Sequence, residues 1–129
     1  MRLVSLDTMT RELTQRLVEE VEHTRLIARD CGAVLRTSPA LPERAASAPG
    51  VLPTALQVAE TLLRASAHRG AVAEIGRYGG WLVVRIAANM DAHEWRLRVV
   101  RDRLAWFDGR LRVEAAELGS RVTVSLPMS

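Results

Sequence analysis

Apolar side chains recur at intervals of three and four residues in three stretches of this chain, which is the spacing of one helix face. The first stretch starts near Asp7 or Thr8, either of which can cap a helix, and ends before Gly32. The second opens with Pro53, a residue favoured in the first helical turn, and the third ends before Gly109. The predicted buried faces are Leu13, Leu17, Val21 or Val18, and Leu26; Leu56, Ala59, Leu63 and Ala67; and Leu97, Val100, Leu104 and Phe107.

Elsewhere the pattern changes to the two-residue alternation of β-strands. One short strand is expected over residues 33–37, and two more over 72–77 and 81–87, joined by a glycine-containing turn at 78–80. The chain then closes with a predicted hairpin. Its inward positions are Leu111, Val113 and Ala115 on one strand and Val122, Val124 and Leu126 on the other, with a turn at Leu118-Gly119-Ser120.

This order of elements predicts an α+β fold, a two-layer sandwich in which a mixed sheet of about five strands is covered on one face by three helices. We interpret residues 1–129 as a single domain, since a chain of this length supports one hydrophobic core. Residues 38–52 lie in the segment richest in proline and alanine, and we predict a long loop there.

Charge and cysteine content narrow the class of protein. All 18 basic residues are arginine, the formal net charge is only +3, and the acidic residues are interleaved with the arginines along the chain. This balance does not favour a nucleic-acid partner. Cys31 is the only cysteine, so no intrachain disulfide is expected. With neither a signal peptide nor a membrane-spanning run in the sequence, we expect a cytoplasmic protein.

Residues 81–126 carry the most specific pattern of the chain, in the segments WLVVRIAANM (81–90), HEWRLRVVRDRLAWFDG (93–109) and GRLRVEAAELGSRVTVSLP (109–127). A strand, a helix, a glycine and a hairpin ending in Leu-Pro resemble the ATP-binding domain of sensor histidine kinases, the Bergerat-type (GHKL) fold shared with gyrase and MutL. The resemblance extends over essentially the whole chain. It implies the histidine kinase ATPase-domain fold, bacterial two-component signalling, and ATP with Mg²⁺ as ligands in the members that are active.

The resemblance also implies four local features, of which the first is an Asn on the second helix that holds Mg²⁺ against the triphosphate. Alignment on Pro53 places Ser66 at that position, and a shifted alignment places Arg64 there. A hydroxyl is a poor replacement for an amide oxygen as a ligand of a hard cation, and an arginine would repel the metal.

The second feature is Asp-x-Gly-x-Gly after the third strand, in which the Asp accepts a hydrogen bond from adenine and the glycines let the backbone approach the nucleotide. The aligned residues are Ala88, Asn89, Met90, Asp91 and Ala92. The Asp is replaced by alanine, and both glycines by residues with side chains. Asn89 or Asp91 could still supply an acceptor, but only along a changed backbone path.

The remaining features are a long lid before the last helix and a Gly-x-Gly-Leu that turns backbone N–H groups toward the phosphates. The predicted helix begins at His93 or Glu94, so only a few residues remain for a lid. The aligned Glu94-Trp95-Arg96-Leu97 keeps the leucine and lacks both glycines. Glu94 also places a negative charge where the phosphates would approach.

Each missing contact is typically worth about 1–3 kcal/mol, whereas nucleotide binding at nanomolar to micromolar affinity requires about 8–12 kcal/mol. We therefore predict a non-catalytic histidine kinase-like domain, a pseudoenzyme without ATP, Mg²⁺ or another cofactor. It would act in regulation through a protein partner or as a homodimer. Two alternatives stay open: a divergent catalytic domain that binds ATP and phosphorylates a histidine on another chain, and a small-ligand sensor that uses the vacated pocket.

Other reactive side chains favour ordinary roles. His23 is interpreted as a surface residue and Cys31 as a packing thiol, while His68 and His93 lack partners at metal-ligand spacing, so we expect no metal site. No residue set matches a catalytic triad or dyad.

The candidate interaction surface consists of Trp95, Trp106, Arg98 and Arg101 on the third predicted helix. One interpretation packs the two tryptophans against the proline-rich loop and the sheet, and the other exposes them to a partner. The hypothesis also fills the former nucleotide face with Met90, Trp95 and their neighbours. The sequence leaves the partner and the oligomeric state undetermined.

Overall fold

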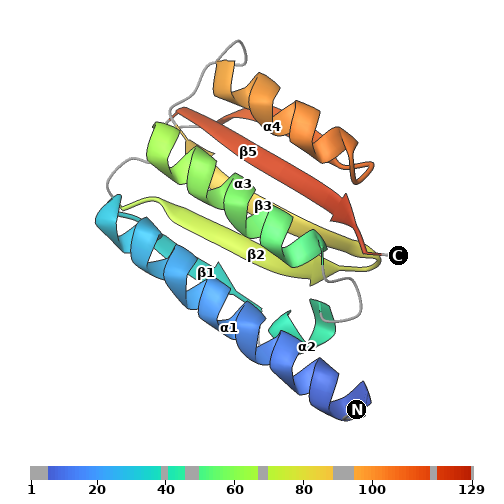
Figure 1. The fold of residues 1–129 in the computed structure, drawn as a ribbon. Coiled ribbons are helices and arrows are strands. Elements are labelled where there is room, and N and C mark those ends of the chain that lie inside the picture. Colours follow the sequence, from blue (N-terminus) through green and yellow to red (C-terminus); the bar gives the residue numbers. More distant parts are fainter. Residues whose placement is uncertain are drawn as a thin grey trace.

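The computed structural model of the chain describes residues 6–38, 41–45, 50–66, 70–88, 95–116 and 119–128. They form four helices and five strands, with a short helix between the first strand and the second long helix (Figure 1). Their bounds are α1 (Leu6–Asp30), β1 (Val34–Thr37), α2 (Leu41–Ala45), α3 (Val51–Ser66), β2 (Val72–Tyr78), β3 (Trp81–Ala88), α4 (Trp95–Ala105), β4 (Arg110–Ala116) and β5 (Gly119–Pro127).

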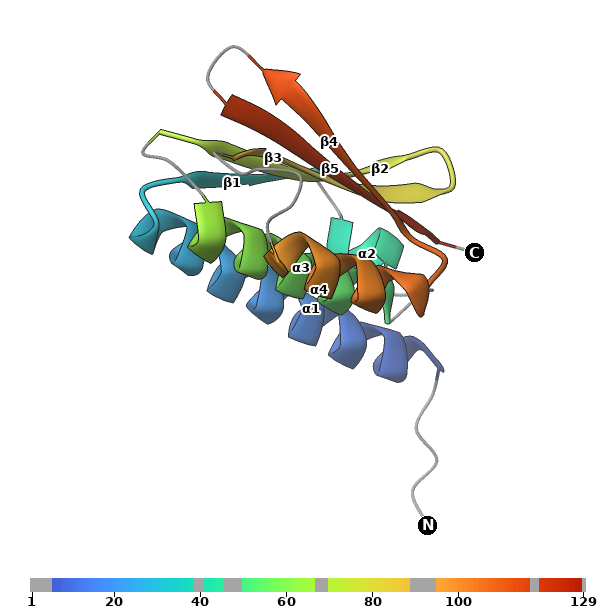
Figure 2. The same ribbon diagram turned by 90° about the horizontal axis from the view of Figure 1, so that it is seen from above.

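The five strands form one mixed sheet in the order β1-β2-β3-β5-β4. Only β1 and β2 run parallel, and every other neighbouring pair is antiparallel. All the helices lie on one face of this sheet, and the other face carries no helix of the described chain (Figure 2). The predicted α+β sandwich, with a mixed five-stranded sheet under three long helices, is confirmed.

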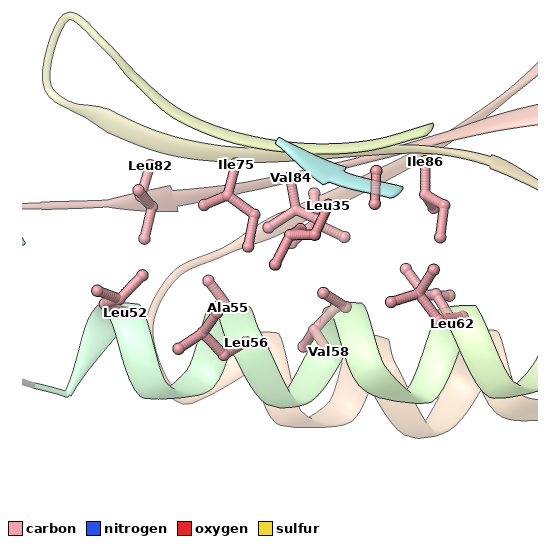
Figure 3. Packing of buried hydrophobic residues seen from close by; sticks show 14 of the residues in the cluster. Leu35, Leu52, Ala55, Leu56, Val58, Leu62, Ile75, Leu82, Val84 and Ile86 are labelled. Atoms are coloured by element: carbon pink, nitrogen blue, oxygen red, sulfur yellow. The ribbon is translucent and has the colours of Figure 1, made fainter. Parts of the chain in front are cut away.

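The core lies between α3 and the middle strands. Leu52, Ala55 and Leu62 of α3 are fully buried and point toward Ile75 and Ile86 of the sheet (Figure 3). The helix buries apolar residues at almost every turn, and the facing strands bury alternate residues, so both periodicities meet at one interface. Burial of this apolar surface is the main driving force that holds the two layers together.

The buried face of α1 differs from the predicted one. Leu17 and Val21 are buried as expected, but Leu26 is 58% exposed. Leu26 lies nine residues after Leu17, which at about 100° per residue is the opposite side of a helix. The face continues instead through Thr24 and Ala28, and the Thr24 hydroxyl donates a hydrogen bond of 3.1 Å to the Glu20 carbonyl.

The predicted loop at 38–52 is wrong in part, because α2 lies inside it and α3 already begins at Val51, two residues before Pro53. Leu41 and Ala45, four residues apart in α2, are both fully buried. A single helical turn therefore brings two apolar side chains into the core from a segment whose composition favours a loop.

Two further predictions in the C-terminal region need correction. Gly119 and Ser120 do not form the hairpin turn but belong to β5, where Ser120 pairs with Ala115; Ala115 lies on the same face of the sheet as Leu111 and Val113 but is exposed. Phe107 lies beyond the end of α4 and packs against the core while only partly buried. Both errors shift an element boundary by two residues or fewer and leave the topology unchanged.

No helix in the described part of the chain is long and apolar enough to span a lipid bilayer.

Candidate functional site

Three elements of the candidate site meet at one end of the sandwich. The C-terminal end of α3, the end of β3 and the first turn of α4 lie at the same edge of the molecule, and α3 and α4 run side by side over the sheet (Figure 1). The fold thus brings together positions 66, 88 and 95 even though they lie far apart in the sequence.

The end of α3 offers no amide side chain. Arg64, the residue of the shifted alignment, is exposed and its Nε lies 3.2 Å from the Glu60 carboxylate one turn earlier. Ser66 is the last residue of the helix, and its side chain is outside the described part of the chain. Leu62 and Leu63 just before it are buried, so this end of α3 is fixed by core packing.

The end of β3 continues as regular strand through the position where the motif would place its Asp. Ala88 is still in register with Ser120 of β5, one step beyond the pair Ala87–Arg121. Asn89, Met90, Asp91, Ala92 and Glu94 lie outside the described residues, as do His68 and His93.

The first turn of α4 presents large side chains in place of bare backbone. Trp95 is 64% exposed, and the guanidinium of Arg96 lies 4.9 Å from the centroid of its ring. Leu97, by contrast, is completely buried. Leu97 is therefore a core residue. The prediction that Trp95 fills the face where the resemblance would place a nucleotide is wrong, because an indole exposed to this extent is not packed into a pocket.

The outer face of α4 is partly apolar. Trp106, just beyond the helix, is 88% exposed, so the interpretation that packs both tryptophans is wrong. Arg98 and Arg101 are exposed, as is Val99, which sequence reasoning overlooked. Val99 follows Trp95 by four residues and shares its face of the helix, which is the spacing signal that could have identified it.

Among the described residues, no group of three or more His, Cys, Asp or Glu side chains lies close enough together to hold a metal ion.

Several hollows lie on the sheet face that carries no helix. One of about 480 Å³ is lined by four arginines, one glutamate and two hydroxyl side chains: Arg85, Arg110, Arg112, Arg121, Glu114, Thr123 and Ser125. Sequence analysis did not single out these arginines, although all of them occupy the polar positions of alternating strands.

No family model matches this chain, and no curated protein matches it in sequence. Among solved structures, it matches the histidine kinase domain of the Erythrobacter litoralis EL346 blue-light activated histidine kinase with a TM-score of 0.55 at 14% identity, over 87% of this chain and 60% of that one. A second structure of that Erythrobacter litoralis EL346 kinase gives a TM-score of 0.54 at 14% identity, over 95% of this chain and 48% of that one.

The Acinetobacter baumannii histidine kinase AdeS gives a TM-score of 0.52 at 14% identity, over 89% of this chain and 64% of that one. The chain thus spans between about half and two thirds of the length of these kinases. It has the fold of histidine kinase domains, and at this level of identity the likeness concerns the fold alone.

Proposed function

We propose that this domain has lost ATP and Mg²⁺ binding and acts as a regulatory module that contacts another protein chain. The observation that carries the proposal is the first turn of α4, where Arg96 aligns with the second phosphate-binding glycine and its guanidinium is stacked on the exposed indole of Trp95, the variable residue of the motif. Bare backbone N–H groups are what a triphosphate needs at a helix N-terminus, and these side chains obstruct the approach to them.

Two other positions of the candidate site also support the proposed loss of ATP and Mg²⁺ binding. The residues aligned with the magnesium-binding Asn and the adenine-binding Asp are Ser66 and Ala88. Neither can supply the lost contact, because a methyl group accepts no hydrogen bond and a single hydroxyl is a weak ligand for Mg²⁺.

Titration calorimetry of the purified chain with ATP and with ADP, each with MgCl₂, tests the loss of nucleotide binding. We expect no saturable, magnesium-dependent heat, because the described site lacks the orienting groups that such affinity requires. A histidine kinase domain that binds ATP, titrated under the same conditions, provides the positive control. Micromolar ATP affinity that depends on Mg²⁺ would contradict the proposal and favour the alternative, a divergent catalytic domain.

The contact surface that we propose is the outer face of α4. Trp95 and Val99 lie one turn apart on the side of the helix opposite to the buried Leu97, Val100 and Leu104, and Trp106 follows at the end of the helix. Tryptophan is enriched among the residues that dominate binding energy at protein interfaces. Arg98 and Arg101 beside them would form the polar rim of such a contact.

Self-association through this face is tested by sedimentation equilibrium. We expect a concentration-dependent dimer whose dissociation constant rises at least about tenfold in the double variant Trp95→Ala/Trp106→Ala. Met9→Ala/Leu26→Ala removes two comparably exposed apolar side chains from α1 and is expected to leave the dimer unchanged. Equal weakening by both double variants would contradict a role for α4, and a wild-type chain that stays monomeric would exclude the homodimer.

A further inference from the structure

The net positive charge of the molecule is concentrated on the sheet face that carries no helix. Its outward-pointing charged residues are Arg36, Glu74, Arg85, Arg110, Arg112, Glu114 and Arg121. Five arginines and two glutamates give this face a charge of +3, which equals the formal net charge of the whole chain. The remainder of the molecule is therefore balanced, and an anion approaching it is attracted to this face.

Strand register places the arginines around one residue. Thr123 of β5 is in register with Arg85 of β3 on one side and Arg112 of β4 on the other, while Arg121 precedes it by two residues on the same face. Neighbouring strands lie about 4.8 Å apart, so the Cα atoms of Arg85 and Arg112 are about 10 Å apart. Their side chains are long enough to converge on an anion above the half-buried Thr123 hydroxyl.

Two arginine side chains on this face are already stacked on aromatic rings before any ligand binds. The guanidinium of Arg110 lies 5.4 Å from the Trp81 ring centroid, and that of Arg85 lies 5.1 Å from the Tyr78 ring centroid. Stacking restricts a guanidinium but leaves the N–H groups at its edge free to donate hydrogen bonds. Such preordering lowers the entropy that an incoming ligand must overcome.

Two carboxylates of this face neighbour these arginines, Glu74 in register with Arg85 and Glu114 in register with Arg121. Glu114 lies 3.4 Å from Arg112, and the two side chains are 48% and 77% exposed. An ion pair exposed to this degree contributes little stability, so a ligand with several negative charges can displace Glu114.

We propose that the open sheet face binds a compact oligophosphate in the hollow above Thr123. The hollow measures about 480 Å³, within the range of small-molecule sites, and its four arginines match a ligand with two or more phosphate groups. Thr123 and Ser125 add hydroxyl donors at its floor. A single-stranded nucleic acid fits less well, because a guanidinium group already lies over each of the Trp81 and Tyr78 rings, on which bases would stack.

Inorganic tripolyphosphate, titrated without magnesium and followed by calorimetry, tests this site. We expect saturable binding that weakens with added salt, and at least about a tenfold loss of affinity in Arg112→Gln/Arg121→Gln. Arg11→Gln/Arg16→Gln removes the same charge from exposed positions of α1 and is expected to bind like the wild type. Thr123→Val provides an independent change at the centre of the hollow, with a smaller expected loss.

Three outcomes would overturn the proposal: no saturable binding, equal weakening by the two double variants, or binding of a single-stranded DNA decamer that tripolyphosphate does not displace. The site is independent of the former nucleotide site. Nucleotide binding that needs no magnesium and is lost in Arg112→Gln/Arg121→Gln belongs to the open face. Magnesium-dependent binding that survives this substitution would instead contradict the proposed loss of ATP.

Discussion

Gly109 shows how tightly single residues are constrained where α4 turns into β4. The preceding Asp108 adopts a positive φ of 54°, and the Gly109 N–H donates a hydrogen bond of 2.9 Å to the Leu104 carbonyl. The chain thereby reverses directly against the core. A Cβ at position 109 would lie 2.9 Å from Leu126 Cδ2 and 3.1 Å from Leu104 Cβ, so there is no room for one.

Gly109→Ala is therefore expected to lower the free energy of unfolding by about 1–3 kcal/mol, the usual cost of forcing extra atoms into a packed site. Gly80→Ala is the matched control, since nothing lies within 4 Å of the Cβ it would add. Urea denaturation of the two variants measures the difference. Equal stability of the two variants would show that the backbone at position 109 moves aside.

At the scale of single residues, the sequence gives the identity of each residue at the candidate site but not its environment. It shows by itself that position 66 is a serine and position 88 an alanine. Whether Trp95 packs or points outward does need one, because burial depends on which residues of other elements lie opposite a side chain. The 64% exposure of Trp95 follows from the way α4 packs on the sheet, which only the tertiary structure determines.

At the scale of elements, helix periodicity identified the helices better than it identified their faces. The predicted stripe of α3 contains Leu56, Ala59 and Leu63, which are all buried, but Leu62 is buried as well. A central helix that contacts α1, α4 and the sheet buries more than one stripe. On α1, which lies at the edge of the helical layer, a narrower face is buried and Leu26 falls outside it.

Leu62→Ala should consequently cost about 2–5 kcal/mol of folding stability, as is typical for a leucine truncated in a packed core. Leu26→Ala on α1 should change stability by no more than about 0.5 kcal/mol, because its side chain is largely in solvent. Thermal and chemical unfolding of both variants provide the measurement. A large loss in Leu26→Ala would indicate that this side chain is covered by another chain in solution.

At the scale of the whole molecule, the two faces have different characters. The helical layer displays the apolar stretch of α4 at its surface, and the bare sheet displays arginines. Along the sequence, acids and arginines are interleaved, and the net charge of +3 predicts no concentrated basic face. Strand alternation then separates these residues from the apolar ones, because each charged residue of β3, β4 and β5 points to the side away from the helices.

The sequence by itself determined the order of the long helices and the strands, the α+β class and the identities of the residues at the candidate site. These follow from local periodicity and from residue identity, which no tertiary contact can alter. Only the tertiary structure decided which side chains are exposed on α4, that a turn of helix fills part of the 38–52 loop, and that the arginines of β3, β4 and β5 surround Thr123. Each of these depends on the register of strands and on helix contacts between distant segments, which local patterns do not encode.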